Sequence, residues 1–310
     1  MNKKNLIIKS LLGLLLTVSL SSATLAETNP IKNKIKNSFN SKINSKINAA
    51  TAAASDKIST FAKDNFESIK YLDFSIQGQE ELKPTFSIMS VNEILKIDSG
   101  TIFNQTSFNN HDGDQTINIG FGARKLLNEN KILLGSNIFY DHQFNNTHDR
   151  TGAGVEAISS IFDIRGNYYN ALSGRRSDGG DGFERALDGW DTQIDYHLPV
   201  KHDVSVFLNA FKFDNPEAGS NYKETGNKMG LNAKFGHFLV EAGYMNDNQE
   251  NDSYFGSIKF VINMGEDKVY NSKDPLEMLY VGNKLYEPVK RENKIRVVKI
   301  SASGLSASGF

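Results

Sequence analysis

The chain of 310 residues contains no cysteine. This absence excludes disulfides, thiolate metal sites, thiol nucleophiles and a lipid anchor on an N-terminal cysteine. Tryptophan occurs once, whereas Phe (20) and Tyr (11) are frequent, a balance that suits a sheet protein better than a helical one. The formal net charge of -1 leaves no basic surplus, so nucleic acid is not expected as a partner.

Long apolar runs are also rare, because no stretch after the N-terminus reaches the roughly 20 apolar residues that a transmembrane helix needs. At the N-terminus, Lys3, Lys4 and Lys9 precede or interrupt LLGLLLTVSL, and the small-residue run SSATLA follows. This order is typical of a secretory signal peptide, so we predict that residues 1–26 are removed after Ala26. A membrane anchor is the alternative, although the apolar run is short for crossing a bilayer.

Residues 27–66 differ in composition from the rest of the chain. They begin with a repeat of Asn, Ser, Lys and Ile whose apolar residues lie four apart, a spacing that gathers them on one face of a helix. A solvated low-complexity spacer is an equal interpretation of residues 27–48, because Asn and Ser are poor helix formers. The Ala-rich stretch from Ala49 to Glu67 favours a helix. We therefore predict a periplasmic lead-in, low in complexity and partly helical, and no separate domain.

From about residue 67 to residue 264, apolar and polar residues alternate. The stretch DQTINIGFGARK, for example, sets Ile117, Ile119 and Phe121 against Asn118 and its polar neighbours. A period of two predicts strands with one apolar and one polar face. Such alternation predicts about twelve strands, near residues 68–77, 84–92, 100–109, 114–125, 132–143, 150–159, 161–170, 189–198, 203–213, 227–235, 238–246 and 252–264.

Two architectures use strands of this kind. A soluble sandwich buries its apolar faces, whereas an outer-membrane barrel turns them to lipid and lines its interior with the polar ones. The ionic residues favour the barrel, because they gather on one face and leave the other nearly free of charge. The residues predicted to face the lumen are Arg124, Asp141, Glu156, Asp163, Arg165, Asp191, Asp195, Lys234, Glu241 and Lys259. The predicted fold class is all-β: a transmembrane, antiparallel outer-membrane β-barrel over residues 67–264.

The connections between the predicted strands sort by length. Those that follow odd-numbered strands include NNHDGD, LSGRRSDGGDGF and FDNPEAGSNYKETG, and most are long and polar. Those that follow even-numbered strands include SSI, LPVKH and GH, which are short, as the periplasmic turns of such barrels are. An even number of strands leaves both ends of the barrel domain in the periplasm.

Several motifs resemble, in order and spacing, the β-domain of the intimin and invasin family, the inverse autotransporters. The most distinctive are NIFYDHQF, HDRTGAGVE, NYYNALSG, GWD and LYEPVKRENKI, and the resemblance covers roughly residues 49–300. It implies a twelve-stranded barrel in outer-membrane lipid, which the barrel assembly machinery inserts with the help of periplasmic chaperones. It also implies that the chain after the last strand returns through the lumen and carries an adhesive passenger outside.

Residues 265–300, after the last predicted strand, fit that route. The apolar residues between Leu276 and Tyr286 can form one face of a helix, and Pro288 predicts where the helix ends. We expect a lumenal helix over residues 276 to about 290, followed by an extended linker that includes KIRVV. The residues of this segment expected in the lumen are Leu279, Lys284, Tyr286, Arg291 and Arg296. A surface helix packed below the barrel is the alternative.

Only SASGLSASGF, residues 301–310, follows this segment, which is too little for an adhesive domain of about 100 residues. The expectation is either a family member without a passenger or a truncated gene product, and the sequence identifies no passenger or host receptor. We expect a translocator barrel of the inverse autotransporter type. The alternative is a small outer-membrane pore or structural barrel.

Motifs for catalysis are scarce. The G-x-G patterns of GFGAR and TGAGVEA lie inside alternating strands with no helix after them, which does not indicate a phosphate site. His111, His142 and His148 lie near acids on predicted outer loops, where they could bind a metal or serve a hydrolase at the rim. The sequence contains neither GxSxG nor HExxH. We therefore expect no enzyme activity, no metal and no cofactor.

Overall fold

The chain divides into two compact units, residues 1–61 and 62–310, and the fold described here belongs to the second. The computed structural model describes residues 60, 67–80, 82–178, 180, 182–199, 203–249, 252–264, 277–301 and 304–308, with side chains up to Ile300. The predicted signal peptide and nearly all of the predicted lead-in lie outside these residues.

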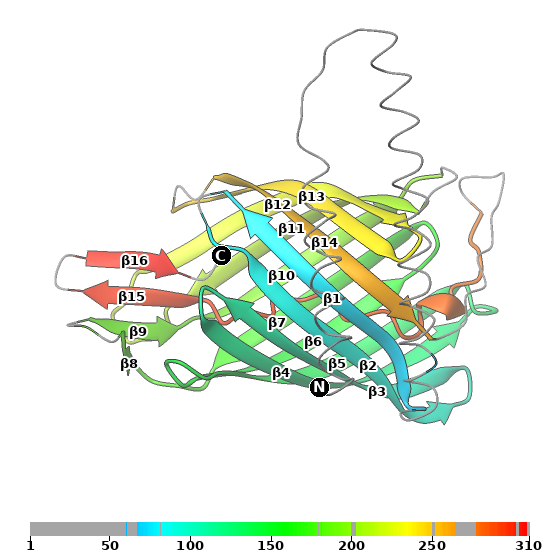
Figure 1. Cartoon of the computed structure of the whole chain (residues 1–310), viewed down its shortest axis with the longest axis horizontal. Helices are drawn as coiled ribbons and strands as arrows, with labels where there is room; N and C mark the ends of the chain where they lie inside the picture. The colour runs from blue at the N-terminus through cyan, green and yellow to red at the C-terminus, as the bar shows by residue number, and fades with distance from the viewer. Residues whose placement is uncertain are drawn as a thin grey trace, which may run out of the picture. The chain divides into compact units, whose positions relative to one another are not determined.

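Within the described residues, twelve antiparallel strands close into a barrel (Figure 1). They are β1 (Ile69–Gln79), β2 (Thr85–Ile97), β3 (Gly100–His111), β4 (Asp114–Leu127), β5 (Ile132–Gln143), β6 (His148–Ile158), β7 (Phe162–Ala171), β10 (Asp188–His197), β11 (Val204–Asp214), β12 (Lys223–Phe235), β13 (Phe238–Asp247) and β14 (Ser253–Asn263). Each strand pairs with the next in this series, and β1 pairs with β14 through the register Phe74 to Phe260, which closes the barrel. The all-β prediction of about twelve antiparallel strands is therefore confirmed.

The two faces of the barrel wall differ as the alternation predicts. On the outside, large apolar side chains such as Ile138 and Leu208 are each 63% exposed. On the inside, polar side chains such as Asn118 and Asp141 are fully buried. A soluble sandwich would bury its apolar rows, so this arrangement excludes the sandwich and fits a wall that faces lipid.

The two faces predict a difference in tolerance to charge. Arginine at Ile138 is expected to lower the free energy of unfolding by about 2 to 4 kcal/mol, because it places a charge on the lipid-facing surface. Arginine at Gln77, which lines an interior cavity, is the matched control and should cost much less. Urea unfolding in lipid vesicles measures both changes, and equal losses would contradict the assignment of the faces.

A second, four-stranded sheet has the order β16, β15, β9, β8. Strands β8 (Arg176–Ser177) and β9 (Phe183–Ala186) belong to the connection between β7 and β10, and β15 (Val297–Ser301) and β16 (Gly304–Ser308) come from the end of the chain (Figure 1). Strand β15 pairs antiparallel with β9, Val297 opposite Ala186. The sequence predicts only a polar loop between β7 and β10, whereas the structure places two short strands there and pairs β9 with the C-terminal β15.

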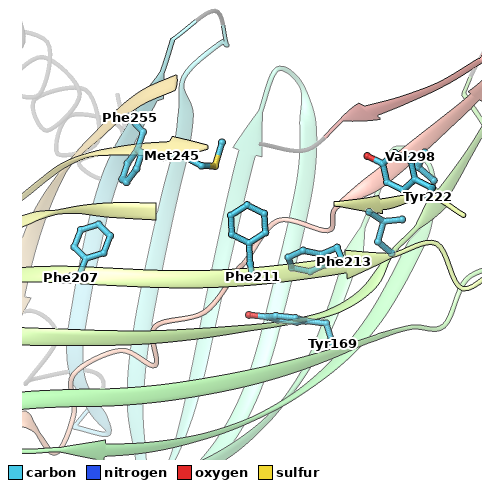
Figure 2. Packing of buried hydrophobic residues seen from close by; sticks show 9 residues of the cluster. Tyr169, Phe207, Phe211, Phe213, Tyr222, Met245, Phe255 and Val298 are labelled. Carbon is cyan, nitrogen blue, oxygen red and sulfur yellow. The ribbon is translucent and has the colours of Figure 1, made fainter. Parts of the chain in front are cut away.

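Part of the barrel interior is aromatic. Phe207, Phe211 and Phe213 all point inward from β11, and they form one buried cluster with Tyr169 and neighbouring residues (Figure 2). The rings of Tyr169 and Phe213 stack with their centroids 5.7 Å apart. A glycine on the next strand makes room for one of these rings, because a Cβ on Gly230 would lie 2.8 Å from Cε1 of Phe207.

The expected lumenal helix over residues 276 to about 290 is wrong. From residue 277 onward the described chain contains one helical turn, the 3-10 helix η1 (Gly282–Lys284), and is otherwise extended or irregular. Gly282 and Pro288 both disfavour a continuous helix. No helix in the described part of the chain has the length and apolar character needed to cross a membrane.

Candidate functional site

The candidate site is the barrel lumen together with residues 277–300, here called the lumenal strap. At one end of the barrel, the Leu279 N–H donates to Ser160 Oγ (2.8 Å) and the Val281 N–H donates to the Asn130 carbonyl (2.8 Å). These two partners lie in the β6 to β7 and β4 to β5 connections. At the other end, β15 of the strap pairs with β9 in the β7 to β10 connection. The strap therefore runs through the barrel from one end to the other (Figure 1).

Inward-facing side chains of the wall hold the backbone of the strap. Gln105 makes two bonds to one residue, because its Oε1 accepts from the Val289 N–H (2.7 Å) and its Nε2 donates to the Val289 carbonyl (3.4 Å). Further wall donors reach strap carbonyls: Asn118 to Asn293 (2.9 Å), Arg124 to Leu285 (3.0 Å), Arg150 to Glu292 (2.6 Å) and Asn167 to Lys290 (3.1 Å). These bonds replace those a helix would make internally, which explains why an extended chain is stable here.

A buried, bidentate side-chain contact between wall and strap centres on Asp141 of β5. Both of its carboxylate oxygens accept from Arg291 of the strap, at 2.8 Å each, in a bidentate pair. Arg150 Nε (2.8 Å) and Asn118 Nδ2 (2.7 Å) donate to the same carboxylate. The side chains of Asp141, Arg150 and Arg291 are almost completely buried, so solvent screens these charges little.

A second ionic cluster lies nearer the β6 to β7 turn. Arg165 lies between Asp163 (3.0 Å) and Asp195 (2.7 Å) on the wall. The strap adds Lys284, 3.3 Å from the Asp163 carboxylate, and Lys290, 2.8 Å from the Asp195 carboxylate. Each of these wall carboxylates thus pairs with one cation of the wall and one of the strap.

Two more buried arginines complete the network. Arg124 pairs with Glu156 at 2.6 Å, both on the wall. Arg296 of the strap pairs with Glu224 of β12 and lies 3.1 Å from Glu292 within the strap. Aromatic rings cover these cations: the guanidinium carbon lies 4.7 Å from the ring centre for Arg124 over Phe103, 4.4 Å for Arg150 over Tyr169, 4.2 Å for Arg291 over Phe139 and 4.5 Å for Arg296 over Phe211.

The structure brings most of the predicted lumen residues into this network. Six of them take part in the pairs above: Arg124, Asp141, Glu156, Asp163, Arg165 and Asp195. Asp191 is also buried and accepts from the Tyr169 hydroxyl (2.5 Å) and from Asn167 (3.0 Å). Glu241 and Lys259 line a cavity beside the strap, whereas Lys234 is exposed near the end of β12.

The predicted strap residues divide in a similar way. Lys284, Arg291 and Arg296 join the ionic pairs, and the Tyr286 hydroxyl donates to Glu93 of β2. Leu279 is half-buried and contributes its backbone N–H. Gln105 and Arg150 were not predicted to face the lumen. On β6 the alternation identifies the inward face of Arg150, whereas both faces of β3 carry polar residues around Gln105, so the sequence gives no clear signal there.

The strap does not fill the lumen. Its contacts with the wall reach from β2 through β7 to β10 and β12, and beside it remains a cavity of about 220 Å³. Polar residues of the other wall line this cavity, including Ser75 and Gln77 of β1 and Lys259 of β14. Phe207, Phe211 and Phe255 line it as well, so the space beside the strap is partly polar and partly aromatic.

The histidines proposed for a rim site have separate partners. His111 Nδ1 lies 2.9 Å from Thr85 Oγ1, His142 Nδ1 lies 2.8 Å from Asp149 Oδ1, and His148 Nδ1 lies 3.0 Å from Ser173 Oγ. Within the described ranges, no three histidine, aspartate or glutamate side chains come together in a way that could hold a metal ion.

Glu184 of β9 links the second sheet to the barrel. Its carboxylate accepts from Asn146 (2.5 Å), and lies 3.6 Å from His148 Nε2 and 3.3 Å from Lys299 Nζ of β15. Burial by itself raises the pKa of the Glu184 carboxyl, but the neighbouring imidazole of His148, the hydrogen bond from Asn146 and the charge of Lys299 outweigh it and lower the pKa. The carboxylate is therefore ionised at neutral pH, where it holds the β7 to β10 connection against both the barrel and the strap.

A closed twelve-stranded barrel with an apolar outer wall and an ionic interior is that of an outer-membrane protein. The chain belongs to the inverse autotransporter β-domain family, whose sequence profile matches residues 18–293. The resemblance noted in the motifs and the predicted location in the outer membrane are thereby confirmed. Barrels of this family are translocators and generally not enzymes.

Two named relatives share part of the sequence. An attaching and effacing protein homolog of Escherichia coli (strain K12) is 28% identical over 149 residues, which are 47% of this chain and 48% of the relative. Invasin of Yersinia enterocolitica is 31% identical over 104 residues, 33% of this chain and 12% of the relative. The chain thus spans about half the length of the first relative and much less of the second.

One solved structure, from work on the in-meso crystallisation of membrane proteins, has a similar fold. It superposes with a TM-score of 0.62 at 19% sequence identity, and covers 76% of this chain and 100% of its own. At this level of identity the likeness concerns the fold alone.

Proposed function

We propose that this barrel is a translocator of the inverse autotransporter type, in which the lumenal strap connects the membrane domain to whatever the C-terminal end carries outside. The proposal rests on the hydrogen bonds that side chains of the wall make to the backbone of the strap. Gln105, Asn118, Arg124, Arg150 and Asn167 bond main-chain groups of the strap. Such bonds suit a passing polypeptide, because every residue offers the same backbone groups whatever its side chain.

The proposed orientation places the β7 to β10 connection and the second sheet outside the cell. The two longest connections between barrel strands, β7 to β10 and β11 to β12, lie at that end, and long connections face outward in bacterial barrels. Residues 1–26 act in this proposal as a signal peptide and residues 27–66 as a periplasmic lead-in. N-terminal sequencing of the purified barrel tests the cleavage after Ala26.

Tag accessibility tests the orientation and the route of the strap. An epitope tag after Phe310 is expected to bind antibody on intact cells, because β15 emerges at the end proposed to face outward. The same tag inserted at Gly236, in the β12 to β13 turn at the opposite end, should bind only after the outer membrane is permeabilised. If the tag after Phe310 also needs permeabilisation, the strap does not deliver the C-terminus to the surface.

The partners proposed for this function are outer-membrane lipid, the barrel assembly machinery and periplasmic chaperones. A small pore remains the second candidate, and the cavity beside the strap is the observation that favours it. Conductance of the full chain separates the two functions. A strapped translocator should pass little current, whereas a pore should show steady large conductance.

A further inference from the structure

The hydrogen bonds between the wall and the strap backbone do not by themselves fix where the strap stops. Gln105 and Asn118 bond main-chain groups of Val289 and Asn293, and other residues carry the same groups. A chain that slides along the wall can therefore exchange one set of these bonds for the next. Its final position has to come from side chains, which differ from residue to residue.

Arg291 of the strap occupies a site in the wall that fits its side chain. Its guanidinium makes the bidentate pair with Asp141, and its carbon lies 4.2 Å from the ring centre of Phe139 and 5.4 Å from that of Tyr169. Gly152 leaves the space, because a Cβ there would lie 3.0 Å from Arg291 Nη2. Paired donors and a planar group that stacks on rings are properties of arginine and not of lysine.

Arg296 occupies a second site of this kind on another part of the wall. It donates to Glu224 of β12, and its guanidinium carbon lies 4.5 Å and 4.6 Å from the ring centres of Phe211 and Phe213. Strand β12 and strand β5, which carries Asp141, lie five strands apart in one direction around the barrel and seven in the other. Two buried arginines thus tie the strap to nearly opposite sides of the barrel.

The sequence reserves arginine for these two positions. Residues 265–310 contain six lysines, whereas Arg291 and Arg296 are the two arginines among them. The strap lysine next to Arg291 makes a looser contact, because Lys290 lies 2.8 Å from Asp195 but its side chain is 37% exposed. A lysine is a flexible point charge, so it can follow a carboxylate while the chain moves.

We propose that Arg291 and Arg296 are positioning residues that stop the strap, and that the sites around Asp141 and Glu224 recognise an arginine side chain in the passing chain. The inference rests on the proposed translocator function, because only a chain that moves through the barrel has to be stopped. A slip of one residue moves each guanidinium by about 3.3 Å, beyond hydrogen-bond reach of its carboxylate. Each arginine would then be buried without its partner, which is strongly unfavourable.

A pair of cysteines can report the position of the strap, because the chain contains no cysteine of its own. Gln105 Oε1 lies 2.7 Å from the Val289 N–H nitrogen, so Gln105→Cys and Val289→Cys place two thiols near each other. Dibromobimane, which bridges neighbouring thiols, is expected to join them in outer membranes that contain the full chain. Inserting Gly-Ser between Arg296 and Val297 then sets the arginine sites against the pairing of β15 with β9, which alone would bring residue 291 beside position 105.

With both arginines present, the insertion is expected to leave the bridge between positions 105 and 289 intact. When Arg291→Cys replaces Val289→Cys and Arg296→Ala is added, the bridge should form between positions 105 and 291, a shift of two residues. Lys290→Ala, combined with the insertion, is the matched control and should keep the bridge at position 289. Heat-modifiable migration on gels shows whether each variant forms the barrel.

Two results in folded barrels would overturn the proposal. One is a bridge at position 289 that survives the insertion together with Arg291→Ala and Arg296→Ala, since other contacts would then set the position. The other is a bridge that leaves position 289 although both arginines are present. The tag after Phe310 on the unsubstituted chain separates this test from that of the proposed function. An inaccessible tag contradicts the translocator, whereas a displaced bridge with an accessible tag contradicts the arginine sites alone.

Discussion

Replacing Asp141 with alanine is expected to lower the free energy of unfolding of the barrel by about 3 to 5 kcal/mol, the cost typical of breaking a buried ion pair from one side. Asp141 is fully buried and is the common acceptor for Arg150 of the wall and Arg291 of the strap. Its removal leaves two guanidinium groups in the interior without their carboxylate. Urea unfolding of the purified barrel in lipid vesicles measures the loss.

The control for this prediction is a carboxylate in an exposed pair. Asp214 lies 2.8 Å from Lys212, and both side chains are about one third exposed. Asp214→Ala should therefore change the free energy of unfolding by no more than about 1 kcal/mol. Similar losses for Asp141→Ala and Asp214→Ala would show that the buried network does not stabilise the barrel through its charges.

Most of the barrel could be predicted from the sequence because it depends on local period. A strand that separates lipid from a polar interior must alternate at every second residue, and the pattern around Ile119 and Asn118 shows this directly. The same alternation identifies the inward face on which Asp141, Asp163 and Arg165 lie. It does not identify which of these side chains meet, because pairing across strands depends on register and shear.

The strap was predicted wrongly in its conformation for a physical reason. Helical spacing of apolar residues indicates a helix reliably only where a segment must form its backbone hydrogen bonds within itself. Here the wall provides hydrogen-bond donors and acceptors, as Gln105 does for Val289. An extended chain can therefore pair its backbone groups without forming a helix. The local sequence of residues 277–300 does not show which hydrogen-bonding groups of the barrel wall will contact this segment.

The second sheet and the aromatic part of the lumen were missed for related reasons. Strand β9 is four residues long and pairs with β15, which lies more than 100 positions later in the chain. A local sequence pattern therefore cannot predict this pairing. On β11 both faces are rich in apolar residues, so the alternation does not reveal that Phe207, Phe211 and Phe213 point inward. Gly230 leaves room for Phe207 and Arg296 lies over Phe211, and these contacts join residues that are distant in the sequence.

Ending the chain after Met264 is expected to convert the barrel into an open channel. This truncation removes the lumenal strap and leaves all twelve barrel strands, because β14 ends at Asn263. The strap occupies part of the lumen, so its loss joins that space to the cavity of about 220 Å³ already present. Barrels change from filled to water-filled between about eight and sixteen strands, so the single-channel conductance of the truncated barrel should rise clearly above that of the full chain.

The truncated barrel should remain folded, and its conductance can therefore be compared with that of a matched control. Water entering the lumen can hydrate Arg124 and Arg150 after they lose their strap carbonyls, as ordered water does for exposed polar groups. The control ends after Ile300, which keeps residues 277–300 and their contacts and should leave the conductance unchanged. Heat-modifiable migration on gels reports whether both variants form the barrel. If two folded variants conduct equally little, residues of the wall and not the strap close the lumen, and the strap has no role as a plug.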